Sequence, residues 1–179
     1  MYRDLAIEVQ REVEAFLIPS GAKISLQPGT QVSVTQALGN SYTLYVNGNL
    51  VRVAGSDGDA LGLVKLEQPD INQMQGSLEE KVTAQLKTCF DPEIPVNIVD
   101  LGLIYASHIL PLGKDDFHVD ITMTLTAAGC GMGPVLVNEV EEKIRQINGV
   151  TAVKVALVFD PPWDRDRMSD EAKLQLGLL

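Results

Sequence analysis

The sequence predicts an α+β fold in which a small mixed sheet carries helices on one face, preceded by a small N-terminal helix and an antiparallel β unit. First, apolar residues recur every three or four positions over 78–89 and 136–147, as in half-buried helices. Second, a two-residue period over 117–125 and 151–159 is typical of strands with one buried face. Third, the order helix, strand, strand, helix, strand predicts a last strand parallel to its neighbour, through a right-handed connection.

Residues 1–68 are predicted to form an N-terminal extension that begins with a helix. Apolar side chains recur at helical spacing over 3–16, and Pro19-Ser20-Gly21 would end this helix. The apolar stripe consists of Leu5, Val9, Val13 and Phe16. From residue 22 the apolar period changes to two, and Asn47-Gly48 separates two alternating segments. Because both turn residues tolerate a positive φ, this pattern predicts a type I′ β-hairpin.

Residues 77–179 are predicted to form the main domain, after a polar linker. Ser77 and Glu80 fit a capping box, so a helix should begin there. Pro134 suits the first position of a second helix. The other predicted elements are strands over 98–109, 117–125 and 151–159, and a short helix from Ser169 to Gly177.

Composition and charge exclude several classes of function. The net charge is −10 and the 14 Lys and Arg residues form no run, so nucleic acid is not an expected partner. No apolar run approaches the roughly 18 residues of a membrane span, and the first residues do not resemble a signal peptide. We therefore expect a cytoplasmic protein without membrane contact. Two cysteines are too few for a disulfide framework.

Cys130 is the strongest candidate for a chemical role. It lies in a glycine-rich loop over 129–133, between a predicted strand and the N-terminus of a predicted helix. The positive end of that helix should depress the pKa of the thiol, and Gly129 and Gly131 would let a ligand or partner approach the backbone closely. The alternative is a small buried residue in a tight turn, and the local pattern does not decide between the two.

A single reactive cysteine cannot complete a metal site. Cys89 lies on the apolar stripe of the first main-domain helix and is predicted to be a core residue. An iron–sulfur cluster or a tetrahedral metal needs about four ligands. We therefore expect no tightly bound cofactor. Iron or a cluster could be held transiently at Cys130, with the other ligands coming from a second copy of the chain or from a partner protein.

The segment over 91–95 offers two carboxylates between prolines, Asp91 and Glu93. They could act as an oxygen ligand or a general base near Cys130, but the pattern favours a loop in which Asp91 caps backbone groups. Thr126, shortly before the cysteine, could stabilise its thiolate. Trp163 is predicted to be a packing anchor, with contact to a partner as the alternative.

Four segments of the second half resemble the signature of the MIP18-type domain family: DPEIPVNIVDLGLIY (91–105), MTLTAAGC (123–130), DPPW (160–163) and MSDEAKLQLG (168–177). Further segments resemble the long, SUF-associated, SufT-like subgroup of that family: TQALG (35–39), VNGNL (46–50), DALG (59–62) and CGMGP (130–134). The resemblance implies a compact α/β domain with a reactive cysteine at Cys130 and matching motif positions at Asp91, Glu93 and Thr126. The sequence departs from the family at Ala128, where proline is usual, so the loop before Cys130 should be less rigid.

The resemblance also implies a non-enzymatic role as an accessory factor in iron–sulfur cluster assembly or in the maturation of iron–sulfur proteins. Its partners would be SUF-type assembly proteins or iron–sulfur client proteins, and a homodimer would bring two copies of Cys130 together. One alternative is a client-recruiting adaptor that binds through the β unit and Trp163, with a structural Cys130. Another is a non-catalytic component of an oxygenase complex.

Overall fold

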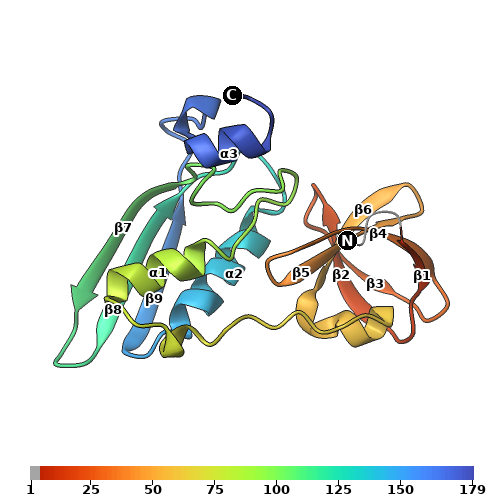
Figure 1. The fold of residues 1–179 in the computed structure, drawn as a ribbon, viewed down its shortest axis with the longest axis horizontal. Coiled ribbons are helices and arrows are strands. Elements are labelled where there is room, and N and C mark those ends of the chain that lie inside the picture. Colours follow the sequence, from red (N-terminus) through yellow and green to blue (C-terminus); the bar gives the residue numbers. More distant parts are fainter. Residues whose placement is uncertain (1–4) are drawn as a thin grey trace. The chain divides into compact units, whose positions relative to one another are not determined.

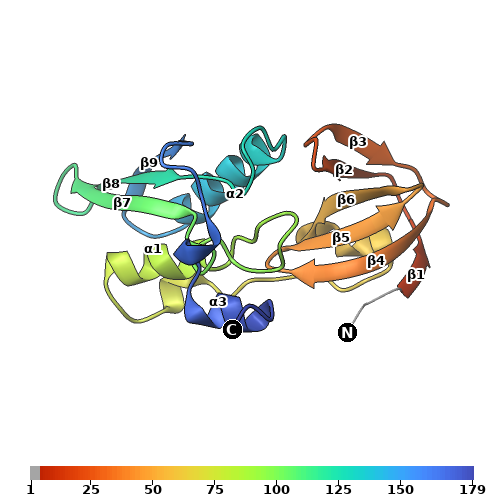
Figure 2. The same ribbon diagram turned by 90° about the horizontal axis from the view of Figure 1, so that it is seen from above.

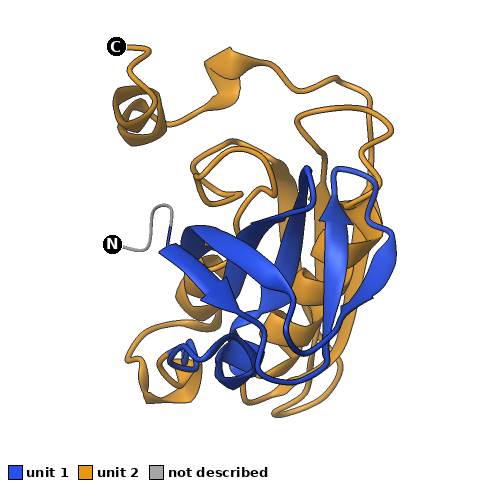
Figure 3. Cartoon of the chain, turned by 90° about the vertical axis from the view of Figure 1, so that its right-hand side faces the viewer, with its two compact units in different colours: residues 1–68 blue, residues 69–179 orange. Residues whose placement is uncertain are grey.

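The computed structural model describes residues 5–179, which form two compact units, residues 1–68 and residues 69–179 (Figures 1 and 3). Each unit encloses its own hydrophobic core, and no residue belongs to both cores. Among residues 5–179, no helix is long and apolar enough to cross a membrane.

Unit 1, residues 1–68, is an antiparallel six-stranded sheet with the strand order β1-β4-β5-β6-β2-β3 (Figure 2). A short 3₁₀ helix, η1, follows the last strand over Gly55–Leu61. The inward side chains, mostly valine and leucine, form the core of the unit. The strands are β1 (Leu5–Glu8), β2 (Val13–Ile18), β3 (Lys23–Leu26), β4 (Gln31–Leu38), β5 (Ser41–Val46) and β6 (Asn49–Ala54).

The helix predicted over 3–16 is wrong, because the described part of that segment forms strands β1 and β2. Leu5, Val9 and Val13 are four residues apart, which places them on one face of a helix but equally on one face of an extended chain. In β2 the buried residues are Val13 and Ala15, two positions apart. Residues 9–12 separate the two strands; β1 pairs with β4, and β2 pairs with β3 and β6.

The hairpin predicted at Asn47-Gly48 is confirmed. Strands β5 and β6 are paired up to Val46 and Asn49, so the turn has two residues. Both have positive φ, 48° at Asn47 and 83° at Gly48, as a type I′ turn requires.

Unit 2, residues 69–179, has the predicted order helix, strand, strand, helix, strand, and α1 and α2 cover one face of its sheet (Figures 1 and 2). Strand β8 pairs antiparallel with β7 and parallel with β9, which confirms the mixed sheet. The elements are η2 (Ile71–Gln73), α1 (Leu78–Leu86), β7 (Ile104–Pro111), β8 (Phe117–Met123), α2 (Gly133–Arg145), β9 (Val150–Leu157), η3 (Arg165–Arg167) and α3 (Asp170–Gln175).

The helix ends follow the predicted chemistry. The Ser77 side chain accepts a hydrogen bond from the Glu80 backbone, and the Glu80 carboxylate accepts one from the Ser77 backbone, so the capping box is formed. Ser169 caps α3 in the same way at Ala172. Helix α2 begins one residue earlier than predicted, at Gly133.

The strand predicted over 98–109 begins only at Ile104. Residues 97–103 instead form turns, because the Asn97 side-chain oxygen accepts hydrogen bonds from the backbone N–H groups of Val99 and Asp100. The apolar residues that suggested a strand, Ile98, Leu101 and Leu103, are fully buried below these turns. Apolar content alone does not distinguish a buried turn from a strand.

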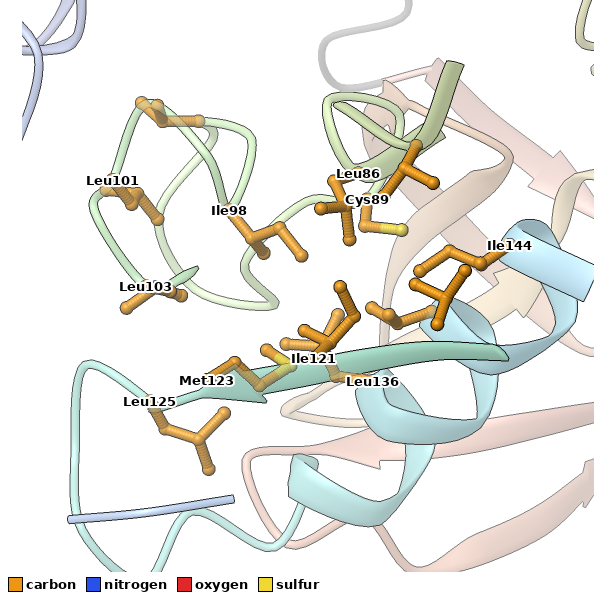
Figure 4. Packing of buried hydrophobic residues seen from close by; sticks show 14 of the residues in the cluster. Leu86, Cys89, Ile98, Leu101, Leu103, Ile121, Met123, Leu125, Leu136 and Ile144 are labelled. Atoms are coloured by element: carbon orange, nitrogen blue, oxygen red, sulfur yellow. The ribbon is translucent and has the colours of Figure 1, made fainter. Parts of the chain in front are cut away.

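Cys89 is a core residue, as predicted. Its side chain is 0% exposed and lies among the apolar side chains of the helices, the 97–103 turns and β8 (Figure 4). It therefore contributes to packing in unit 2.

Candidate functional site

Cys130 lies in a tight loop between β8 and α2. Its backbone N–H donates to the Ala127 carbonyl at 3.3 Å, and its own carbonyl accepts from the Gly133 N–H at 3.1 Å. The residue is half-buried and packs against the core of unit 2. Two residues separate it from Gly133, the first residue of α2, so the thiol is held close to the N-terminus of a 13-residue helix.

Two positions of this loop favour glycine, for different structural reasons. Gly129 has φ +80°, a conformation that favours glycine, although a Cβ there would meet no atom within 4 Å. At Gly133 the reason is space, because a Cβ would lie 3.1 Å from Leu125 Cδ1 and 3.2 Å from Leu157 Cδ1. Gly131 is half-buried within the same turn. The start of α2 therefore packs tightly on the sheet, while the outer part of the loop is open.

Asp91 is a buried carboxylate that caps its own loop. Its Oδ1 accepts hydrogen bonds from the backbone N–H groups of Glu93, at 2.9 Å, and Ile94, at 2.8 Å. The residue is only 4% exposed. Glu93 contributes its backbone N–H to this turn, whereas the residue itself is exposed.

Burial raises the pKa of the Asp91 carboxyl above its usual value. The hydrogen bonds from Ile94, Glu93 and Thr126 favour the charged form and oppose this effect, while the nearby charge of Glu93 adds to it. Asp91 is therefore a carboxyl whose proton is held more tightly than in water.

Thr126 joins the Asp91 loop to the loop that carries Cys130. Its hydroxyl donates to Asp91 Oδ2 at 3.3 Å, across 35 positions of sequence. Thr126 is four residues before the cysteine, so the structure brings Asp91 into contact with the Cys130 loop. Ala128 and Gly129 lie exposed in between.

The C-terminal segment is hydrogen-bonded to the 97–105 segment. These contacts were not predicted from the sequence. Trp163 Nε1 donates to the Leu101 carbonyl at 2.7 Å, and Tyr105 donates its hydroxyl to the Pro161 carbonyl at 2.8 Å. The Arg167 guanidinium lies 4.5 Å from the centre of the Tyr105 ring. Trp163 therefore serves as an internal anchor of unit 2.

Gly102 allows the C-terminal segment to lie directly on this loop. Its φ is +74°, and a Cβ there would lie 2.2 Å from the Arg167 carbonyl oxygen. The backbone N–H of Ser169 donates to the Asp100 carbonyl at 2.8 Å, and Gln175 Nε2 donates to the Pro95 carbonyl at 2.9 Å. An isolated glycine in an apolar segment was the available signal for this close approach.

This site offers few side-chain atoms that could bind a metal ion. Among residues 5–179, no group of three or more His, Cys, Asp or Glu residues is arranged to hold a metal ion. Cys130 supplies one sulfur, and the Asp91 oxygens already accept three hydrogen bonds.

Comparison with known proteins places the similarity in unit 2. Residues 79–155 match the model of a family described as iron-sulfur cluster assembly protein. An Fe-S protein maturation auxiliary factor of Porphyromonas gingivalis is 46% identical over 101 residues, which cover 56% of this chain and 92% of the relative. The Fe-S protein maturation auxiliary factor SufT of Staphylococcus aureus is 38% identical over 88 residues, covering 49% of this chain and 96% of the relative.

Among solved structures, a domain of unknown function, DUF59, from Bacillus anthracis is 35% identical. The match covers 57% of this chain and 93% of that chain, with a TM-score of 0.48. About half of this chain thus accounts for nearly the whole length of the two maturation factors, and the remainder lies outside these matches.

Proposed function

The chain belongs to the iron–sulfur cluster assembly protein family, and from this premise we propose that it is an accessory factor in the assembly or maturation of iron–sulfur proteins. It acts without catalysing a reaction of its own, through the thiol of Cys130. The observation that carries the proposal is the half-buried Cys130 in a tight loop before α2, inside the unit that matches the family. Iron, sulfur or a cluster is the cargo, and it is bound only in transit.

The helix end favours such a cargo. Iron–sulfur clusters bound by thiolates carry negative charge, and the N-terminus of a helix carries a partial positive charge and unsatisfied N–H groups. Helix α2 has 13 residues and begins three positions after Cys130. The exposed Ala128 and Gly129 leave room beside the thiol for a partner's backbone.

Asp91 and Thr126 act by holding the loop. The Thr126 hydroxyl donates to Asp91, so we assign it an indirect effect on Cys130, through the position of the loop. The buried Asp91 in turn fixes the 91–94 turn through two backbone hydrogen bonds. The exposed Glu93 carboxylate is available to orient a partner or accept a proton.

The cargo is shared between molecules. A single sulfur cannot satisfy the roughly four ligands that a cluster needs, so a SUF-type assembly protein, a client protein or a second copy of this chain supplies the others. A site completed in this way releases its cargo when the two molecules separate. Such a role suits a protein of the cytoplasm, where free thiols persist.

The test combines genetics and anaerobic chemistry. The Cys130→Ala variant is expected to lose complementation of a defect in iron–sulfur enzyme maturation, whereas Thr124→Ser, a conservative change in the same loop region, is expected to retain it. Absorption spectra and iron and sulfide analysis of both variants, purified anaerobically with and without an assembly partner, show whether Cys130 holds cargo. Full complementation by a folded Cys130→Ala protein would refute the proposal.

A further inference from the structure

Helix α3 lies beside the loop that follows α1 and is bonded to it at both ends (Figures 1 and 2). The backbone N–H of Ser169, the residue that caps the start of α3, donates to the Asp100 carbonyl at 2.8 Å. At the other end of the helix, Gln175 Nε2 donates to the Pro95 carbonyl at 2.9 Å. The two ends of one short helix therefore hold the two ends of the 95–100 backbone.

The loop that α3 holds is also the loop that contacts the cysteine loop. An isolated β-bridge between Phe90 and Asn97 closes it at its base. Within this loop, Asp91 accepts the hydrogen bond that the Thr126 hydroxyl donates from the cysteine loop. The loop is therefore bonded to α3 through one residue, Pro95, and to the cysteine loop through another, Asp91.

Helix α3 has few interactions that would keep it folded. It has six residues, and isolated helices shorter than roughly 12–15 residues are marginal in water. Ala172 is the one buried residue of α3, whereas Leu174 is 68% exposed. The hydrogen bonds of Trp163 and Tyr105 hold the segment before α3 separately. Because segments with few buried apolar contacts open most readily, we expect α3 to open while the three-stranded sheet stays folded.

We propose that α3 is a latch that controls access to the thiol of Cys130. While α3 is folded, its bonds to Pro95 and Asp100 restrain the loop after α1. That loop in turn restrains the cysteine loop through the bond between Asp91 and Thr126. When α3 opens, both loops gain freedom and the half-buried thiol becomes more accessible. Opening of the latch is thus the step that lets cargo reach or leave the sulfur.

The latch rests on the proposed function for its biological meaning, because it regulates cargo only if Cys130 binds cargo. The two ideas nevertheless fail separately. Complementation by Cys130→Ala tests the function of the thiol. The rates of hydrogen exchange and of thiol labelling test the latch, and neither measurement requires cargo or a partner protein.

The first variant of the full chain, Ser169→Ala, loosens α3 itself. It removes the cap in which the Ser169 hydroxyl oxygen accepts from the Ala172 N–H at 3.1 Å. The Lys173 and Leu176 amides donate to the carbonyls of Ser169 and Ala172 and report on the folded helix. Hydrogen exchange measured by NMR at these two amides is expected to become about fivefold faster, the effect of losing a typical N-cap.

The same variant should loosen the candidate site. The Ile94 amide, which donates to Asp91, reports on the loop after α1. Its exchange and the labelling of Cys130 by iodoacetamide are each expected to become at least about twofold faster. Labelling of Cys89, which is 0% exposed in the core, should keep its wild-type rate.

A second variant, Gln175→Ala, cuts the link and leaves the helix folded. It removes the bond to the Pro95 carbonyl, and alanine is a strong helix former. The loop after α1 and the Cys130 thiol should respond as they do to the first variant, while exchange within α3 stays unchanged. Leu174→Ala is the matched control, because this neighbouring side chain is 68% exposed and its loss should change neither rate.

Asp70→Ala is the control for the loss of a cap elsewhere in unit 2. Asp70 accepts from the Asn72 N–H at the start of η2, and its replacement should leave labelling of Cys130 unchanged. Faster exchange in α3 with an unchanged rate at Cys130 would overturn the proposal, since the helix would not restrain the thiol. So would an α3 that does not respond to Ser169→Ala. Equal acceleration at Cys89 would also overturn it, because unit 2 would then be opening as a whole.

Discussion

The hydroxyl of Thr126 donates a hydrogen bond of 3.3 Å to Oδ2 of the buried Asp91, and this contact joins the two loops of the candidate site. Asp91 belongs to the turn after α1, and Thr126 lies between β8 and Cys130. A contact between residues so distant in sequence makes the position of the cysteine loop depend on the protonation and packing of a carboxyl group. The first two predictions follow from it.

Thr126→Val removes this hydrogen bond and keeps the shape of the side chain. Because the bond favours the charged form of Asp91, the pKa of Asp91 is expected to rise further above its usual value. Titration of the Asp91 carboxyl carbon by NMR measures the change. Thr83→Val is the control, since the Thr83 hydroxyl donates its hydrogen bond within α1, to the Glu79 carbonyl. An unchanged pKa of Asp91 in Thr126→Val would show that the hydroxyl does not act on it.

Asp91 should also make unit 2 less stable as the pH rises. Its pKa is raised in the folded state, so the folded protein binds a proton that the unfolded chain has already released. This contribution is fully present below the unfolded pKa, about 3.9 for Asp. It is lost as the pH rises through the folded value. Asp91→Asn removes the dependence, so the variant should gain stability relative to wild type as the pH increases.

The single tryptophan, Trp163, provides the measurement, because its fluorescence follows urea unfolding of unit 2. Unfolding curves at several pH values between 4 and 8 give the difference between variant and wild type. Asp115→Asn, at an exposed position, is the control. A difference that does not change with pH would contradict a raised pKa at Asp91.

Cys130 should react with a thiol reagent long before Cys89 in the native protein. Cys89 is 0% exposed, whereas Cys130 is half-buried at the edge of its loop. Labelling of Cys130 by iodoacetamide is expected to be at least about tenfold faster, because a buried thiol reacts only when the structure opens. Mass spectrometry of digests taken over time measures both rates. Equal rates would instead favour a structural Cys130 and the adaptor hypothesis.

Gly102→Ala should displace the C-terminal segment from the 97–105 loop. The new Cβ would lie 2.2 Å from the Arg167 carbonyl oxygen, at a residue with φ +74°. We expect a loss of about 2–4 kcal/mol of unfolding free energy. A red shift of Trp163 fluorescence should accompany it, as the bond to Leu101 is broken.

Gly177→Ala separates the two causes of this loss. Gly177 has φ +71°, but a Cβ there meets nothing within 4 Å, so only the conformational cost of about 1 kcal/mol remains. Equal losses in both variants would mean that the close approach of Arg167 contributes nothing.

The predictable parts of the fold are those decided by neighbouring residues. The turn at Asn47-Gly48 and the capping box of Ser77 and Glu80 are local devices, and both are present. The helix predicted over 3–16 failed because a spacing of four is compatible with both periodicities. Ile7 and Ala15 add a two-residue apolar spacing to Leu5, Val9 and Val13, and this spacing indicates strands.

The candidate site was less predictable, because its contacts are not local. The sequence indicated Cys130 before a helix, but not that Thr126 would donate to Asp91 or that Trp163 would bond to the Leu101 carbonyl. The 97–103 turns were missed because the Asn97 side chain replaces the hydrogen bonds of a strand. Such contacts depend on tertiary packing, which periodicity does not encode.

The separation of the two hydrophobic cores has an evolutionary consequence. Because no residue belongs to both cores, a substitution in one core removes no residue from the other. A gene that exchanged the first unit would retain the cysteine loop unaltered, and one that lost the loop would still encode the six-stranded sheet of unit 1. The cysteine loop and the unit 1 sheet can thus be inherited separately.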